Sequence, residues 1–369
     1  MKIGIITQPL RTNYGGLLQN YALQQALKQL GHEPITLNQE KTSIPLWRII
    51  ASFIKTFLLK FIGKGRNRQY PFQMNDKKIA YIRQHTNKFI DKYIAHTEAF
   101  QYDSEFRDYT INHQLEALIV GSDQVWRPMY NQSLLRSFLD FTKDLQVRRI
   151  AYAASFGVDY WEFNEEHTEQ AKKMIDKFNG ISVREISGVD LCKKYLNVNA
   201  VHVLDPTMLL DKEDYVHLVK EENEQISKGN LFTYILDKSD EKKLIIDKIA
   251  LELDLQPFSS MPNNDIDIYP PVTRWIRSFM DAEFVVCDSF HGAVFSIIFN
   301  KPFLIIGNRE RGISRFDSLL NTFGLCDRML NDYADIHLMV NSPIDWKTVN
   351  KIRVEMKESS INFLKSYLK

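Results

Sequence analysis

The sequence predicts an α/β fold of two Rossmann-like, doubly wound domains that face each other across a cleft. Strand-like apolar runs alternate with helix-like segments along the chain, which is typical of mostly parallel sheets. At 369 residues the chain is longer than one hydrophobic core usually grows. Leu204-Asp205-Pro206-Thr207 interrupts the pattern before it starts again. We therefore expect an N-terminal domain at 1–205 and a C-terminal domain at 206–369.

Short apolar runs bounded by turn residues mark the expected strands. They lie at 2–7, 34–37, 117–120, 149–153, 182–184 and 200–203 in the first half, and at 231–236, 284–287 and 302–306 in the second. The clearest helix covers 17–30, where apolar residues recur at helical spacing and Gly31 supplies a stop. Further helices are expected at 293–299 and, as a charged amphipathic segment, at 345–369.

Composition and charge narrow the classes of function. With 44% hydrophobic and 25% charged residues the chain is an ordinary globular protein. Its 47 basic and 46 acidic residues leave a net charge of +1, so no global field favours nucleic acid as a partner. The three cysteines are odd in number and widely spaced, which fits a reducing compartment. We expect a cytoplasmic protein whose first residues form a buried strand and not a signal peptide.

His291 lies where a buried-looking strand breaks into polar residues and a helix begins. A histidine there can titrate near neutral pH, and the helix N-terminus offers free backbone N–H groups to an anion. In the alternative interpretation, Asp288 or Ser289 only caps the helix and His291 is a structural side chain.

Arginines follow two other strands. Arg309 and Arg311 come after the run 302–306, and Arg184 ends a short apolar run. Guanidinium groups bind carboxylate and phosphate with two-point geometry, which suits a small dianionic substrate. The alternative for 309–311 is a solvated loop whose charges pair with nearby acids.

Polar groups that suit a sugar follow the strand at 117–120. Asp123 and Gln124 offer hydrogen bonds beside the aromatic plane of Trp126. An equally good interpretation is a capped turn with Trp126 in the core. Near the N-terminus, the loop Asn13-Tyr14-Gly15-Gly16 can cradle a phosphate. It lacks the spacing of a dinucleotide fingerprint or a P-loop, so neither a nicotinamide cofactor nor ATP is indicated.

The segment 44–70 has an unusual composition. It carries six basic residues, no acid and many large apolar side chains. That pattern resembles an interfacial helix on an anionic membrane surface, although its lysines interrupt it too often for a membrane span. The alternative is an ordinary helix packed on the sheet.

Taken in order, these motifs resemble those of the polysaccharide pyruvyl transferase family over nearly the whole chain. The resemblance rests on Asn13-Tyr14-Gly15-Gly16 with Leu18-Gln19 and Tyr21-Ala22-Leu23, then Gly121-Ser122-Asp123-Gln124-Val125-Trp126, Ser155-Phe156-Gly157, Ser182-Val183-Arg184-Glu185, Asp205-Pro206-Thr207, Asp288-Ser289-Phe290-His291-Gly292 and Lys301-Pro302. It implies a GT-B-like pair of domains. It also implies an enzyme that transfers the pyruvyl group of phosphoenolpyruvate onto a sugar hydroxyl pair as a ketal, in cell-surface polysaccharide synthesis.

The resemblance also implies roles for individual residues. Arg184 and His291 match the donor-binding arginine and the histidine that contacts the donor phosphate or acts as the acid. Arg309 or Arg311 would supply a further basic residue. Many relatives have an arginine where this chain has Ser289, so we include Ser289 in the donor site as a departure from the family pattern.

For the acceptor, we expect Asp123 to orient or deprotonate a sugar hydroxyl. The other expected acceptor-binding residues are Asn13, Tyr14, Gly15, Gly16, Gln19, Gln124 and Trp126. Phosphoenolpyruvate is the expected co-substrate, with no other cofactor and no metal, and the acceptor sugar is expected to be free or lipid-linked.

Two other functions compete with this prediction. The same two-domain cleft would serve a GT-B glycosyltransferase that uses a nucleotide sugar. The missing arginine at position 289 would also fit a catalytically inactive glycan-binding protein.

Overall fold

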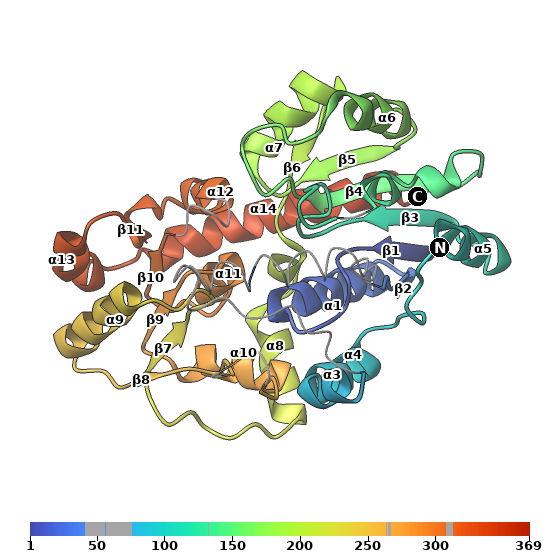
Figure 1. Ribbon diagram of the computed structural model, residues 1–369. Helices are drawn as coiled ribbons and strands as arrows, with labels where there is room; N and C mark the ends of the chain where they lie inside the picture. Colours follow the sequence, from blue (N-terminus) through green and yellow to red (C-terminus); the bar gives the residue numbers. More distant parts are fainter. Residues whose placement is uncertain (41–55, 57–75, 132, 263, 265–266, 308–312) are drawn as a thin grey trace.

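The computed structural model describes residues 1–40, 56, 76–131, 133–262, 264, 267–307 and 313–369. It contains two parallel β-sheets, each covered by helices on both faces (Figure 1). The predicted α/β fold of two Rossmann-like domains is confirmed.

The first sheet is parallel and has the strand order β2-β1-β3-β4-β5-β6. Its strands are β1 (Lys2–Ile6), β2 (Glu33–Thr36), β3 (Ala117–Val120), β4 (Arg148–Ala154), β5 (Gly180–Val183) and β6 (Val201–His202). Their bounds lie within two residues of the predicted runs. This agreement has a physical reason, because central parallel strands are buried on both faces and appear in the sequence as continuous apolar runs.

Helices of the first half alternate with these strands along the chain. They are α1 (Tyr14–Gln29), α3 (Asp76–Ile82), α4 (Gln84–Tyr93), α5 (Asp103–Asn112), α6 (Glu165–Ile175) and α7 (Ile186–Leu191). The helix α1 starts three residues earlier than predicted, because the Oδ1 atom of Asn13 accepts a hydrogen bond from the backbone N–H of Gly16 and caps it. The chain leaves the helix at Gly31, which has a φ of +82°.

The second sheet is also parallel, with the order β11-β10-β9-β7-β8. Its strands are β7 (Leu231–Tyr234), β8 (Pro257–Phe258), β9 (Phe284–Cys287), β10 (Phe303–Ile306) and β11 (Met329–Leu330), and its helices are α8 (Lys212–Glu221), α9 (Asp240–Leu253), α10 (Val272–Asp281), α11 (Phe290–Ile298), α12 (Ile313–Phe323), α13 (Ile336–Asn341) and α14 (Trp346–Tyr367). The strands β8 and β11 were not predicted, because two residues give no readable periodicity.

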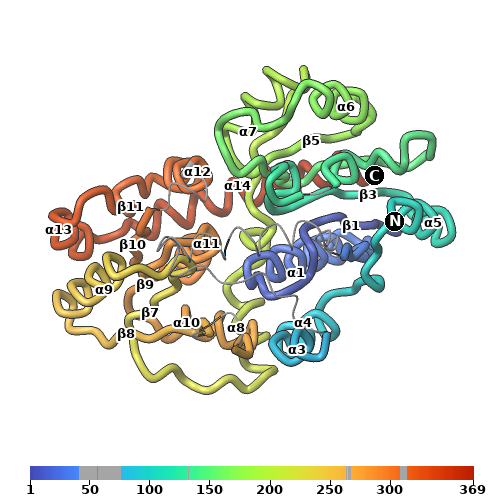
Figure 2. Tube along the Cα trace, viewed as in Figure 1, coloured from blue at the N-terminus to red at the C-terminus, as the bar shows by residue number. Residues whose placement is uncertain are grey.

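The two domains share packing at their junction. The Tyr14 hydroxyl donates to the carbonyl of Pro270 at 2.7 Å, and the Tyr14 ring belongs to one hydrophobic cluster with Trp275 of α10. The helix α14 runs from the second domain back along the first (Figure 2), where Phe363 and Leu364 join the core of the first sheet. We predicted a domain boundary near residue 206, which lies in the chain between β6 and β7. The exact boundary stays a prediction.

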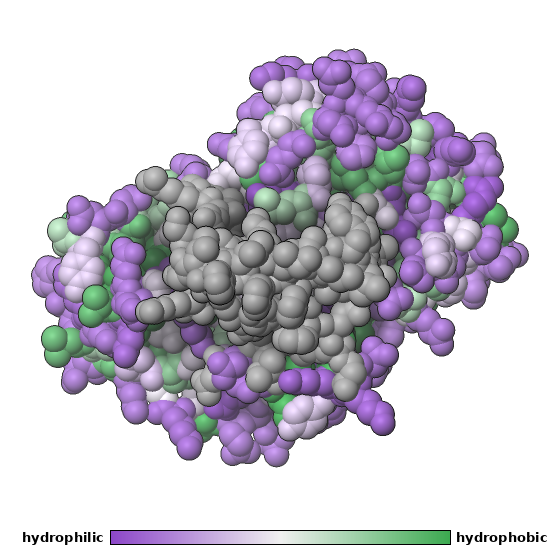
Figure 3. All heavy atoms as spheres, viewed as in Figure 1, coloured by the Kyte–Doolittle hydropathy of each residue, from purple (hydrophilic) through white to green (hydrophobic). Residues whose placement is uncertain are grey.

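Apolar side chains are scattered among hydrophilic ones on the described surface that Figure 3 shows. Among the described helices, none is both long and apolar enough to cross a membrane. The segment 44–70, for which we predicted an interfacial or a packed helix, lies outside the described residues except for residue 56.

Candidate functional site

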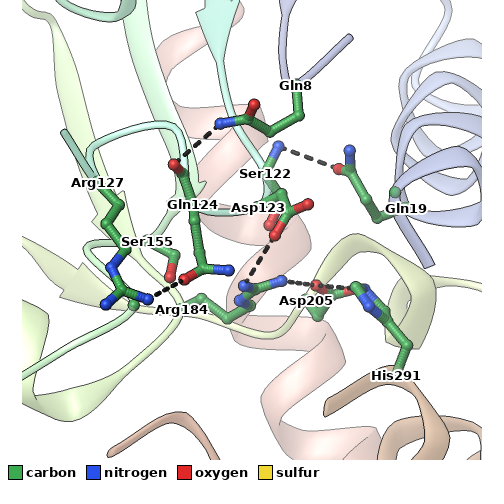
Figure 4. Close-up of polar contacts among 12 residues, drawn as sticks. Gln8, Gln19, Ser122, Asp123, Gln124, Arg127, Ser155, Arg184, Asp205 and His291 are labelled. Atoms are coloured by element: carbon green, nitrogen blue, oxygen red, sulfur yellow. Dashed lines mark hydrogen bonds and ion pairs between the residues drawn. The ribbon is translucent and has the colours of Figure 1, made fainter. Parts of the chain in front are cut away.

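Three charged side chains meet at the carboxyl-terminal edge of the first sheet. Asp123 follows β3, Arg184 directly follows β5, and Asp205 follows β6. Arg184 donates from Nη1 to Oδ2 of Asp205 at 2.8 Å and from Nη2 to Oδ1 of Asp123 at 3.4 Å (Figure 4). All three side chains are buried. The structure therefore brings two predicted site residues, Asp123 and Arg184, into direct contact through their positions at strand ends.

Attraction between the arginine and the carboxylates keeps these buried groups ionised. Burial alone would lower the pKa of Arg184, but the carboxylates of Asp205 and Asp123 outweigh burial and raise it. Burial alone would raise the pKa of Asp205, but the charges of His291 and Arg184 hold it well below its usual range. The Thr207 hydroxyl assists by donating to Asp205 at 2.6 Å. At neutral pH the site thus contains an ionised Arg184–Asp205 pair.

His291 reaches the same network from the second domain. The strand β9 ends at Cys287, and His291 is the second residue of α11. Its Nε2 atom lies 3.5 Å from Oδ2 of Asp205 (Figure 4). A Cβ atom placed on Gly15 would come within 2.0 Å of Nδ1 of His291. His291 therefore fits between the first turn of α1 and Asp205, and a side chain at position 15 would displace it.

The N-terminal part of α1 also holds the loop that carries Asp123. Gln19 accepts a hydrogen bond from the backbone N–H of Ser122 at 3.1 Å and donates to the Thr7 hydroxyl at 2.9 Å. The Asn13 amide lies 3.5 Å from Asp123. Gln19 is fully buried, so its observed contacts position the Asp123 loop.

Other predicted acceptor residues have different surroundings. Trp126 is fully buried, stacks on Phe138 and donates from Nε1 to the carbonyl of Ser137. The prediction that its ring lies open to a sugar is wrong, and the alternative, a core residue, is right. Tyr14 is also buried, at the domain junction. Gln124 remains partly exposed, and its Oε1 accepts from Nη1 of Arg127 at 3.3 Å.

Ser289 and Asp288 hold the turn that carries His291. The Ser289 hydroxyl accepts from the backbone N–H of Gly292 at 3.1 Å and caps α11. Asp288 accepts from the backbone N–H groups of Leu236 and Asp237 and pairs with Lys242 at 2.6 Å. The capping role of Ser289 was the alternative that the sequence left open, and it supplies no positive charge to the site.

One further cation near the site was missed by the sequence analysis. Arg309 and Arg311 lie outside the described residues, but Arg315, in the first turn of α12, is buried. Its guanidinium carbon lies 5.9 Å from the centroid of the Phe290 ring, and that of Arg184 lies 4.4 Å from the same ring. The signal available in the sequence was a third arginine just beyond the pair at 309 and 311. It was overlooked because it falls within a helix and not in the loop after a strand.

A small cavity lies beside this cluster. Arg184, Asp205 and Phe290 line it together with mostly apolar side chains, and its volume of about 10 Å³ holds about one water molecule.

The sequence matches the family model for polysaccharide pyruvyl transferase over residues 13–310. The chain belongs to the polysaccharide pyruvyl transferase family. A comparison with curated proteins gave no match. As a member of this family, the protein is an enzyme of group transfer onto polysaccharide, and its described site combines charged residues from both domains.

Solved structures share the fold of this pyruvyl transferase family member at low sequence identity. Arabidopsis thaliana UGT89C1 complexed with UDP-L-rhamnose matches with a TM-score of 0.53 and 7% identity, covering 98% of this chain and 97% of that one. The S. aureus MnaA co-structure with UDP gives 0.50 and 13%, covering 100% and 96%. Methanocaldococcus jannaschii UDP-GlcNAc 2-epimerase in complex with UDP-GlcNAc and UDP gives 0.50 and 10%, covering 97% and 100%. These similarities support the GT-B-like fold.

Proposed function

We propose that the protein transfers the pyruvyl group of phosphoenolpyruvate onto two hydroxyls of a sugar as a ketal, during synthesis of a cell-surface polysaccharide such as a capsule or an exopolysaccharide. Family membership supports pyruvyl transfer. The observation that carries the proposal is the contact of Arg184 with Asp205 and of Asp205 with His291. This arrangement supports the proposal, because a guanidinium group suits donor binding and an imidazole suits proton transfer, and both contact Asp205 at the domain junction.

The reaction balances without a cofactor. A proton adds to the methylene carbon of the donor, and one sugar hydroxyl attacks C2 and loses its proton. The second hydroxyl then displaces phosphate from C2 and loses its proton to the departing phosphate. The chemistry needs an acid that works near neutral pH and positive groups for the carboxylate and phosphate of the donor.

The described residues fit these roles. His291 serves as the acid, either at the methylene carbon or at the departing phosphate, with Asp205 beside its Nε2 atom. Arg184 binds the donor, and the proposed further cation, Arg309 or Arg311, lies outside the described residues. Asp123 orients an acceptor hydroxyl, and Gln124, Asn13 and the glycines at 15 and 16 border the acceptor.

The proposed acceptor is a sugar on the cytoplasmic side of the membrane, either free or as part of a lipid-linked oligosaccharide. The basic, acid-free composition of 44–70 supports a peripheral contact of this segment with anionic lipid.

Phosphate release tests the proposed function. The purified protein would be incubated with phosphoenolpyruvate and a panel of free and lipid-linked glycans, with a parallel series that contains UDP-sugars. We expect glycan-dependent phosphate release and a product heavier by one pyruvyl ketal. Transfer from a UDP-sugar without phosphate release from phosphoenolpyruvate would replace the proposal with glycosyl transfer.

We predict that His291→Ala lowers turnover by roughly 100-fold or more, the usual contribution of a proton-transfer group. Circular dichroism should remain unchanged, because His291 lies at a helix start and not in the core of a sheet. His337→Ala is the matched control, since His337 is exposed on α13 and pairs with Glu252. Normal turnover in His291→Ala would remove this residue from the mechanism.

A further inference from the structure

Arg184 and Arg315 come from different domains and share one aromatic ring. Arg184 directly follows β5 of the first sheet, and Arg315 lies in the first turn of α12, a helix of the second domain (Figure 1). Both guanidinium carbons lie within 6 Å of the Phe290 ring centroid, which is the range of a cation–π contact. The residue after this ring is His291, so both arginines are grouped around the turn that carries the predicted acid.

A hydrogen bond between the first domain and a side chain of α12 holds this helix in place. The N–H of Ile186 donates to the Ser318 hydroxyl at 2.6 Å. Ile186 lies two residues after Arg184, and Ser318 lies three residues after Arg315, which places Ser318 and Arg315 on neighbouring positions of the helix surface. The positions of the two arginines are therefore tied to each other across the junction.

The pKa of Arg315 depends on burial and on its charged neighbours. Burial, followed by the positive charge of Arg184, lowers the pKa of Arg315 to about 10, although Asp123 and Glu185 act in the opposite direction. A negatively charged group placed between the two guanidinium groups would attract both of them. Ser289, whose hydroxyl is used by the helix cap, contributes no charge to this space.

We infer that Arg315 is a second anion-binding residue of the donor site, which together with Arg184 binds the charged groups of the donor around Phe290. The inference rests on the proposed function in that the donor is taken to be phosphoenolpyruvate. It assigns Arg315 to binding and gives it no part in proton transfer.

Binding measurements on Arg315 variants test this inference. Isothermal titration with phosphoenolpyruvate would compare the wild type with Arg315→Ala and Arg315→Lys. We expect Kd to rise roughly tenfold or more in Arg315→Ala, since a charge-assisted hydrogen bond is lost. Arg315→Lys, which keeps the charge but loses the guanidinium fork, should fall between the two. A Kd within twofold of the wild type in Arg315→Ala would overturn the inference.

A second buried arginine supplies the control for structural damage. Arg328 is buried, and its Nη1 atom donates to the carbonyls of Met339 and Ser342. Arg328→Ala should therefore lower the melting temperature while Kd stays unchanged. If Arg315→Ala fails to fold, the Kd of Arg315→Lys for phosphoenolpyruvate is compared with that of the wild type. A difference of less than twofold would then overturn the inference.

Two simpler probes separate this inference from the proposed function. Inorganic phosphate and pyruvate each carry one of the two charged groups of the donor. If the wild type binds no phosphoenolpyruvate, the proposed function is wrong, and these probes then decide the role of Arg315. Binding of either probe by the wild type that weakens in Arg315→Ala would still support an anion site. Unchanged binding of both probes, or no binding of either, would overturn it.

Discussion

Arg184 stabilises the charged state of the site, because its guanidinium group contacts the buried carboxylates of Asp205 and Asp123. Its removal leaves Asp123 and Asp205 buried without this partner. We predict that Arg184→Ala lowers the free energy of unfolding by roughly 3–5 kcal/mol, the usual cost of breaking a buried ion pair. Urea unfolding would measure this loss.

The same variant should also weaken binding of phosphoenolpyruvate, by on the order of 2 kcal/mol. The double variant Arg184→Ala, Asp205→Asn separates the two effects. It should recover part of the stability, because one unpaired charge is gone, but none of the affinity. Wild-type stability and wild-type affinity in Arg184→Ala would contradict both roles.

At the residue scale, the sequence predicted those site residues whose position relative to a strand was readable. Asp123, Arg184 and His291 were identified because each lies just beyond an apolar run, and parallel sheets gather such positions at one edge. Asp205 appeared only as part of a motif, since its contacts with Arg184 and His291 depend on tertiary structure. Trp126 was assigned to the acceptor because the sequence does not show which way a ring points after a turn.

At the scale of elements, the first turn of α1 controls the space available to the imidazole of His291. We predict that Gly15→Ala lowers turnover by at least about tenfold, because its methyl group would lie 2.0 Å from Nδ1 of His291, and a small misplacement of a reacting group is costly. Gly307→Ala is the control, because Gly307 has no assigned role in the site. Its methyl group would lie 3.8 Å from the Met329 side chain, which is an ordinary van der Waals contact.

Steady-state kinetics and thermal unfolding would be measured for both glycine variants. Equal turnover in Gly15→Ala and Gly307→Ala would mean that the position of His291 tolerates displacement. The prediction of this element from sequence was nearly complete, since the apolar spacing gave the body of α1. Its start was missed by three residues because the cap at Asn13 is a local hydrogen bond that periodicity does not show.

At the scale of the whole molecule, the junction between the domains was the least predictable feature. Nine of the eleven described strands and the helices α1, α11 and α14 were predicted from local patterns. Contacts such as that of the Tyr14 hydroxyl with the carbonyl of Pro270 were not, because they join residues far apart in the chain. The contact of His291 with Asp205 makes this junction relevant to the candidate site, because it joins a side chain of the second domain to the charged network of the first.

Glu222 provides an electrostatic contact across the junction that can be tested by pH. Glu222 directly follows α8. Its carboxylate pairs with Lys88 and Lys92, which both lie in α4, at 2.7 Å each. Hydrogen bonds from Lys88 and then Lys92 lower the pKa of Glu222 to about 2. Because the pKa is lower in the folded state than in the unfolded chain, where it is about 4.3, the stabilising contribution is complete above about pH 5 and is lost as the pH falls toward 2.

We predict that Glu222→Gln lowers the melting temperature at pH 7 by about 2 °C, a small effect because the two lysines are largely exposed. The difference from the wild type should shrink as the pH is lowered from 5 to 3, since the wild-type carboxyl group becomes protonated. Glu221→Gln is the control, because Glu221 contacts only Lys92 of this lysine pair and is more exposed. A difference between wild type and Glu222→Gln that stays constant from pH 7 to pH 3 would show that the charge of Glu222 does not hold the domains together.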